Sequence, residues 1–393
     1  MGLLSPLPAI GAVLVAYAAA SILARTFGLP TDQGRFRSID GLRGYLALFV
    51  FLHHEVVWQS YMRTGQWTMP PSNLYTHLGQ SSVALFFMIT GFLFFSKILE
   101  GREKNIDWGR LFISRVLRLT PLYCVLMVML FGTVAVLSRG QLNQPFKDII
   151  RESISWLSFT IAGRPNINAV PQTDIIVASV VWSLPYEWAF YLSLPLLAIS
   201  VRARTPSLYV IFSITCLCFV LRLGWHPVIF HLFSFLGGVA TSALVRSANF
   251  CRFASTRSAS LVILICLIVL VAAFPNPRSV VAIGLLSLAF ALIACGNSLF
   301  GILWAPASRL LGDISYSIYL LHGIMLYLFF HFALGVPKAC ELAPLYYWLV
   351  AGTFTAVLVP ICFASFRIFE RPAIRNTSAL VAWLRKFPQR SPK

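Results

Sequence analysis

The sequence predicts an all-α fold, a polytopic transmembrane helical bundle of about eleven helices. Of its 393 residues, 58% are hydrophobic and only 11% are charged, whereas charged residues make up about a quarter of a soluble globular sequence. Lipid can solvate such a chain, but the backbone must then hydrogen-bond within itself, which leaves helices or closed barrels. The apolar stretches are long and do not alternate with polar residues, so helices are favoured.

The apolar segments follow one another along almost the whole chain, each near the roughly 20 residues that cross a bilayer. A further stretch, 149–162, is weakly apolar and interrupted, and we place it in a loop. The predicted spans run approximately over 7–28, 42–60, 79–99, 113–137, 174–200, 207–223, 227–246, 258–274, 279–303, 311–334 and 345–368.

The first segment has two interpretations, a signal peptide or a retained helix. No basic residue precedes its apolar run, and Arg25 follows the run instead. Signal peptides have the opposite arrangement. We therefore expect a retained helix, with residues 1–34 forming an extra helix and the loop after it.

The net charge of +18 would suggest nucleic acid in a soluble protein. Here the basic residues fall in short loops, where they determine topology, so we expect no nucleic acid partner. Most of the 31 lysines and arginines lie in alternate loops, which predicts an external N-terminus and a cytoplasmic C-terminus. The longest external connection, 138–173, could fold over an acceptor or simply cap the bundle. The basic tail 373–393 is expected to lie near anionic lipid.

The eight cysteines are scattered singly, mostly inside apolar stretches. There is no CxxC motif and no cluster of cysteine and histidine, so neither a disulfide framework nor a metal site is indicated.

Ionisable residues in the second segment point to function, because charge within the hydrocarbon is costly. Arg43 lies near the start of the segment and His54 eleven residues later, which is about 16 Å along a helix and roughly three full turns. The two side chains therefore share a face, whereas His53 lies about 80° away. His54 is a candidate general base, or it only hydrogen-bonds to a neighbouring helix.

The fifth segment holds one carboxylate, Glu187, with Ser183 and Tyr191 four residues to either side. That spacing puts the three side chains on one helical face. Glu187 could orient or charge a partner in a polar cavity, or it could be a structural hydrogen-bonding clamp.

Two further groups combine polar side chains with helical spacing. Arg115 and Arg118 are three residues apart where the fourth segment begins. Arginine forks suit phosphate groups, although basic residues at such positions often set topology alone. In the tenth segment Tyr316, Tyr319 and His322 could line a cavity, or the tyrosines could be interfacial aromatics.

Together these blocks resemble the acyltransferase-3 family of membrane O-acyltransferases, in family order over about residues 40–372. Arg43 and His54 form the R-x10-H pattern of that family, and Thr90 stands where the family often has serine. The matching blocks are IDGLRG at 39–44, FFMITGFL at 86–93, RVLRLTPLY at 115–123, WSLPYEWAFY at 182–191, LGDISYSIYLLH at 311–322 and FERP at 369–372.

The resemblance implies a membrane domain over 35–372, with a family core of ten helices to which the first helix is extra. It implies transfer of an acyl group, usually acetyl, from cytoplasmic acyl-CoA to a hydroxyl of a carbohydrate or glycoconjugate. Acetyl-CoA is then a co-substrate, and no tightly bound cofactor is expected. The expected location is a bacterial inner membrane. The expected catalytic residues are His54, Arg43 and Glu187, and the expected substrate-binding residues are Arg115, Arg118, Asp40, Trp182, Ser183, Tyr191, Tyr316 and His322.

Two routes of transfer remain open at this point. His54 could act as a general base in a direct transfer, or it could carry the acyl group as a covalent relay. A different class of function, a proton-coupled transporter or flippase, would also use intramembrane arginine, histidine and glutamate. Against it, the sequence contains no inverted repeat that we can detect.

Overall fold

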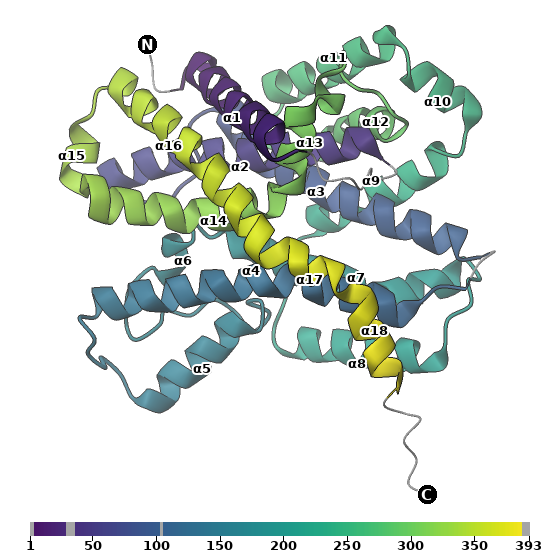
Figure 1. Ribbon diagram of the computed structural model, residues 1–393, viewed down its shortest axis with the longest axis horizontal. Coiled ribbons are helices and arrows are strands. Elements are labelled where there is room, and N and C mark those ends of the chain that lie inside the picture. Colours follow the sequence, from purple (N-terminus) through teal and green to yellow (C-terminus); the bar gives the residue numbers. More distant parts are fainter. Residues whose placement is uncertain (1–3, 29–35, 103–104, 387–393) are drawn as a thin grey trace, which may run out of the picture.

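A computed structural model describes residues 4–28, 36–102 and 105–386, and within these ranges the chain forms helices and no β-strand (Figure 1). The first half of the described chain contains α1 (Pro6–Phe27), α2 (Arg37–Thr64), α3 (Asn73–Glu100), α4 (Trp108–Leu137), α5 (Phe146–Leu157), α6 (Thr173–Ile176), the short 3-10 helix η1 (Val180–Ser183) and α7 (Leu184–Ser200).

The second half continues in the same way and ends in a long, nearly continuous helical run. Its elements are α8 (Ser207–Arg222), α9 (Ile229–Leu244), α10 (Ala248–Ala254), α11 (Arg257–Ala273), α12 (Val280–Ala294), η2 (Ile302–Trp304), α13 (Pro306–Asp313), α14 (Ser315–Leu328), η3 (Phe329–Leu334), α15 (Val336–Glu341), α16 (Pro344–Ser365), η4 (Phe366–Glu370), α17 (Arg371–Arg375) and α18 (Thr377–Lys386).

By length and apolar composition, five helices of the described chain could cross a membrane. They are α1, α3, α4, the run from α14 through η3, and the run from α16 to α18. The count becomes six if α9 and α10, which meet at 107°, form one bent span. The helices α8, α11 and α12 are apolar but shorter. The prediction of a helical membrane protein is therefore confirmed.

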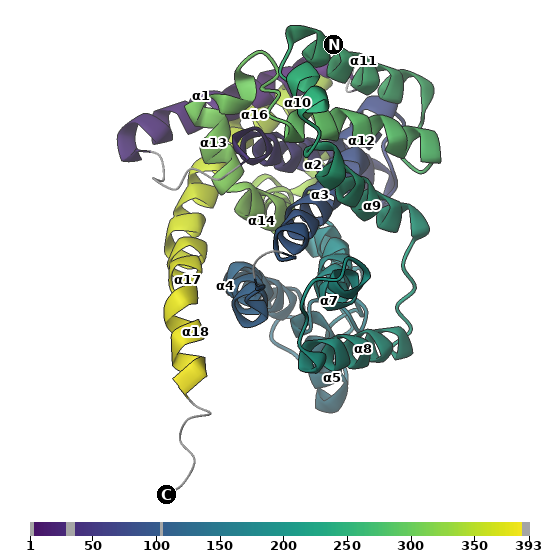
Figure 2. The same cartoon turned by 90° about the vertical axis from the view of Figure 1, so that its right-hand side faces the viewer.

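The helix α3 lies at the centre of the bundle, where it contacts α2, α7, α9, α11 and α12 (Figure 2). Two glycines allow the closest approach. A Cβ atom on Gly91 would lie 2.4 Å from Phe235 O, and one on Gly238 would lie 2.0 Å from Met88 O. Small residues of this kind let helix backbones meet in membrane proteins.

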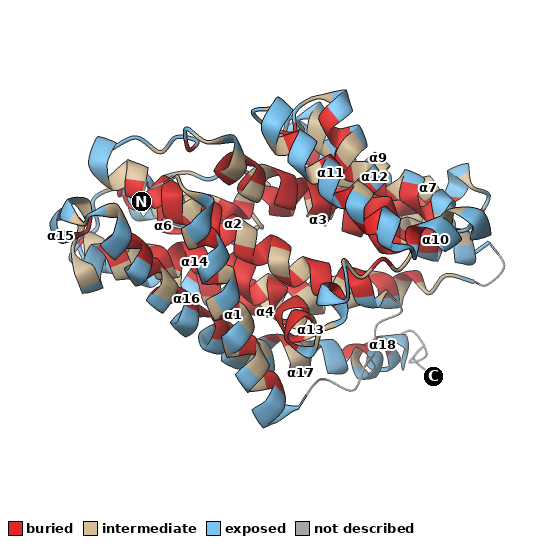
Figure 3. Ribbon diagram, turned by 90° about the horizontal axis from the view of Figure 1, so that it is seen from above, coloured by how far each residue is buried: buried red, intermediate tan, exposed pale blue. Residues whose placement is uncertain are grey.

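Burial follows this arrangement. Buried residues are concentrated on α2, α3 and α14, whereas the outer faces of α1, α15 and α18 are exposed (Figure 3). The extra first helix packs along α16 and α13 through a stripe of alanines. Its members recur at helical spacing and are Ala9, Ala12, Ala16, Ala20 and Ala24.

Two segments differ from the sequence-based expectation. The stretch 149–162, placed in a loop, contains most of the amphipathic helix α5, in which Trp156 is the buried residue. The predicted span 174–200 is interrupted between α6 and η1, where Ala178 and Ser179 adopt φ values of 49° and 56°. Hydrogen bonds from the backbone N–H and the hydroxyl of Ser179 to Asp174 accompany this break.

Candidate active site

A cavity of about 330 Å³ lies where the C-terminal half of α2 meets the N-terminal ends of α3 and α9. We call it the larger cavity. Connecting segments close its rim with Arg164 and Arg278. The side chains on its wall combine rings with hydrogen-bonding groups, and they include His53, His54, Trp67, Gln80, Ser179, Trp182, His231 and Tyr319.

His54 is the partly exposed member of the His53–His54–Glu55 run, because His53 is 5% exposed and Glu55 is 0% exposed. The His54 ring stacks on Trp67, with centroids 6.2 Å apart and planes at 20°. Its Nδ1 atom lies 3.0 Å from Val50 O and 3.0 Å from Nε2 of His322. The ring is therefore held on one edge and open to the larger cavity on the other.

His53 is held differently. Its Nδ1–H donates to Tyr75 O over 2.8 Å. A Cβ atom on Gly79 would lie 2.5 Å from the His53 ring, so the glycine provides the space that the ring fills. This histidine packs α2 against α3, as expected of an interhelical hydrogen bond.

A second cavity, of about 80 Å³, lies toward the N-terminal ends of α2 and α4. We call it the smaller cavity. It is lined by Arg43, Arg115 and Arg118, and none of these guanidinium groups forms a salt bridge with a carboxylate of the described residues. The guanidinium carbon of Arg115 lies 5.1 Å from the centre of the Phe94 ring.

Glu187 faces the three arginines across the smaller cavity. The Tyr191 hydroxyl donates to Glu187 Oε2 over 3.1 Å, and Ser183 lines the same cavity, in agreement with the predicted shared face. Tyr316 is also on this wall, and its hydroxyl donates to Leu119 O over 2.9 Å. Among the described residues, Glu187 therefore faces the arginines without forming a salt bridge with them.

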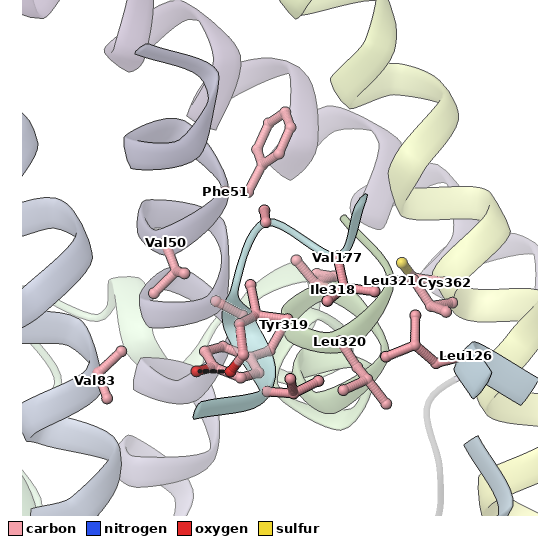
Figure 4. Packing of buried hydrophobic residues seen from close by; sticks show 14 of the residues in the cluster. Val50, Phe51, Val83, Leu126, Val177, Ile318, Tyr319, Leu320, Leu321 and Cys362 are labelled. Atoms are coloured by element: carbon pink, nitrogen blue, oxygen red, sulfur yellow. Dashed lines mark hydrogen bonds between the residues drawn. The ribbon is translucent and has the colours of Figure 1, made fainter. Parts of the chain in front are cut away.

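Tyr319 separates the two cavities and lines both of them. Its hydroxyl donates to Val180 O over 3.0 Å and hydrogen-bonds to Ser183 Oγ at 2.8 Å. Figure 4 shows Tyr319 beside Val50 and Val83 of α2 and α3. Tyr319 thus satisfies the Val180 carbonyl group in the irregular backbone before α7.

The structure does not bring all predicted site residues together. Arg43 and His54 line different cavities and lie about 16 Å apart along the continuous helix α2. Trp182 lines the larger cavity only. His322 is 0% exposed and lies behind His54. Asp40 lines neither cavity.

Two ionisable residues were not predicted, one on the wall of the larger cavity and one outside both cavities. His231 of α9 joins the larger cavity and lies against Trp182, with ring centroids 4.8 Å apart. Glu370, within the FERP block, is buried and accepts a hydrogen bond from Ser317. An intramembrane carboxylate is itself a signal, so Glu370 could have been found from sequence. The same signal applies to His231, an ionisable side chain within the predicted span 227–246.

A family model described as an acyltransferase domain, the acyltransferase-3 family, matches residues 36–365. The chain belongs to the acyltransferase-3 family. No curated protein and no solved structure matches the chain. Membership makes the protein an acyltransferase, and its apolar helices make it an integral, multi-pass membrane protein. The residues that line both cavities lie within the matched region.

Proposed function

We propose that this acyltransferase moves an acetyl group from acetyl-CoA, bound through the arginines of the smaller cavity, to a hydroxyl of a carbohydrate or glycoconjugate in the larger cavity. One observation carries the proposal. His54 opens into a cavity lined with rings, while the arginines without carboxylate partners line a second cavity beyond Tyr319.

The arginines of the smaller cavity suit the phosphate groups of the donor. Coenzyme A carries several phosphate charges on one long, flexible arm, and arginine forks bind phosphate through paired hydrogen bonds. Arg115 and Arg118 lie near the start of α4, where such phosphates would arrive from outside the bundle. The thioester end of the arm then passes Tyr319 to reach His54. Arg43 lies along that path and binds the donor.

The larger cavity fits the acceptor. Sugars present apolar ring faces and a fringe of hydroxyls, which suit aromatic rings beside hydrogen-bonding side chains. Trp67 and Trp182 supply the rings, and Gln80 and Ser179 supply the hydrogen bonds. We therefore assign the acceptor to a carbohydrate or a lipid-linked sugar.

The chemical step uses His54 as a general base. The acceptor hydroxyl oxygen attacks the thioester carbonyl carbon while His54 Nε2 takes the hydroxyl proton. The carbon–sulfur bond then breaks, and the proton returns from His54 to the departing thiolate, which leaves as free CoA. General base catalysis of this kind contributes about 10²–10⁴ in rate.

We also propose the orientation in the membrane. The ends of α2 and α4 that hold the smaller cavity face the cytoplasm of a bacterium, because the neighbouring loops carry most of the basic residues. The C-terminus lies on the same side. The short apolar helices α8, α11 and α12, together with α2, α7 and the bent pair of α9 and α10, bring the proposed number of crossings to about eleven.

The test is release of CoA by the purified protein. Wild type, His54→Ala and the matched control His53→Ala would receive acetyl-CoA with a panel of oligosaccharides and lipid-linked sugars. We expect release that depends on one acceptor and on His54, and a smaller loss in His53→Ala because the His53 ring is held by a hydrogen bond to Tyr75 O.

Two results would contradict the proposal. Full transfer by a folded His54→Ala protein would remove His54 from the chemistry. Failure of the wild type to bind acetyl-CoA would favour the transporter or flippase instead, since such a protein has no need of the donor.

A further inference from the structure

We propose that His322 is a positioning residue that fixes the tautomer of His54, so that the Nε2 atom of His54 is the base. The proposal rests on the proposed function, because it assigns a role within the same reaction. It concerns a contact between residues 268 positions apart in the chain, on α14 and α2.

The backbone of α14 fixes the far edge of the His322 ring. Its Nδ1 atom lies 2.8 Å from Ile318 O. A carbonyl oxygen only accepts hydrogen bonds, so Nδ1 of His322 carries the hydrogen. In a neutral imidazole the other nitrogen is then an acceptor. The Nε2 atom of His322 therefore presents a lone pair to His54.

The Nδ1 atom of His54 faces two acceptors. It lies 3.0 Å from the lone pair of His322 and 3.0 Å from Val50 O. Both contacts require Nδ1 of His54 to carry the hydrogen, which leaves its Nε2 atom with a lone pair. No described residue hydrogen-bonds to that Nε2 atom, and His54 lines the larger cavity. The free lone pair is what a general base needs.

His322 cannot itself be the group that meets the substrate. It is 0% exposed and lines neither cavity. Its ring contacts Phe51 and Tyr319, with centroids 6.2 Å and 6.3 Å away. The next residue, Gly323, lets α14 approach the chain at Val177, where a Cβ atom would lie 2.4 Å from Val177 O. His322 is thus fixed in place and acts only through His54.

The contact between His54 and His322 also stabilises His54 in its charged, imidazolium form. When His54 Nε2 takes the hydroxyl proton, the ring becomes an imidazolium, and its Nδ1–H keeps donating to His322 Nε2. The Nε2 proton then goes to the departing CoA sulfur. Without an acceptor at position 322, His54 keeps only the contact to Val50 O within its own helix, and its ring can present the wrong nitrogen to the cavity.

The experiment compares a side chain at position 322 that can accept a hydrogen bond from His54 with side chains that cannot. His322→Gln retains an oxygen that can accept from His54, whereas His322→Phe and His322→Leu do not. His331→Leu is the matched control, because His331 is exposed and lies outside both cavities. Each purified protein is assayed for CoA release over a range of acetyl-CoA concentrations, and its thermal unfolding midpoint is recorded. If His322→Phe fails to fold, His322→Leu decides.

We expect the folded Phe and Leu variants to lose about 10²-fold in kcat with an unchanged KM for acetyl-CoA. The Gln variant should regain most of that loss, and His331→Leu should match wild type. A purely structural role would not separate Gln from Phe at equal thermal stability.

The outcomes separate this role from the proposed function. Full kcat in His322→Phe, or equal losses in the Gln and Phe variants, would overturn the positioning role while an inactive His54→Ala still supported the acyltransferase mechanism. Full activity in His54→Ala would overturn both.

Discussion

The role of Arg115 and Arg118 can be tested directly through the KM for the donor, acetyl-CoA. Both face the smaller cavity without a carboxylate partner among the described residues. A hydrogen bond to a charged group contributes about 1.5–3 kcal/mol, so Arg118→Gln should raise the KM for acetyl-CoA by roughly ten-fold or more. The kcat at saturating donor should change little, because the group is remote from His54.

The control for this prediction lies on the same helix. Arg110 is exposed and contacts Ser378 rather than the cavity, so Arg110→Gln should leave KM unchanged. Acetyl-pantetheine, which lacks the nucleotide phosphates, should remove the difference between wild type and Arg118→Gln. If Arg118→Gln still had a higher KM than wild type with acetyl-pantetheine, Arg118 would not act by binding the nucleotide phosphates.

Helical phase predicted the residues of one helix well but not the pairing between helices. The spacing of Arg43 and His54 put both on one side of α2, and each lines a cavity. It could not show that the cavities are different, because Tyr319 comes from α14. The contact between His54 and His322 was equally hidden, since it depends on how α2 and α14 pack.

At the scale of elements, the crossing of α3 and α9 depends on Gly238. A Cβ atom there would lie 2.0 Å from Met88 O, which is backbone and cannot move aside cheaply. Gly238→Ala should therefore push the helices apart and disturb the larger cavity, to which both contribute. We expect a loss of about 1–3 kcal/mol, a typical cost of overpacking, measured as a lower thermal unfolding midpoint in detergent.

Gly284 is the matched control, because it lies inside the helix α12, where an added Cβ atom would meet no neighbouring atom within 4 Å. Gly284→Ala should be neutral or slightly stabilising, since alanine has the higher helix propensity. Equal effects of the two substitutions would show that the α3–α9 crossing does not limit stability.

The elements that sequence missed are those whose form depends on tertiary partners. The amphipathic helix α5 exposes an apolar stripe that includes Phe146, Ile150 and Ile154, and its interrupted hydropathy resembled that of a loop. The break before α7 depends on Asp174, which accepts from Ser179, and on Tyr319, which satisfies Val180 O. Hydropathy averages over such breaks, so a continuous span was expected.

At the scale of the whole molecule, neither cavity belongs to one stretch of sequence. The larger cavity draws on α2, α3, α9, α14 and the segment before α7, and the smaller one draws on α2, α3, α4, α7 and α14. Apolar composition could predict a membrane bundle because lipid acts on every span alike. It could not predict the division into two cavities, which requires the packing of all these elements.

The division into two cavities predicts that acetyl-CoA and the acceptor are used from opposite sides of the membrane. In sealed vesicles, only molecules whose smaller cavity faces the added acetyl-CoA should react, and a membrane-impermeant acceptor should be acetylated only on the opposite side. Inverted vesicles should therefore use external acetyl-CoA with an enclosed acceptor, and vesicles of native orientation should not. The reason is that Tyr319, Ser183 and Val83 stand between the two cavities, so each substrate has its own entrance.

Permeabilising the membrane should make the activities of both vesicle preparations equal, which controls for inactive protein. Transfer to an acceptor on the same side as acetyl-CoA in sealed vesicles would show that one cavity receives both substrates, and it would contradict the two-cavity mechanism.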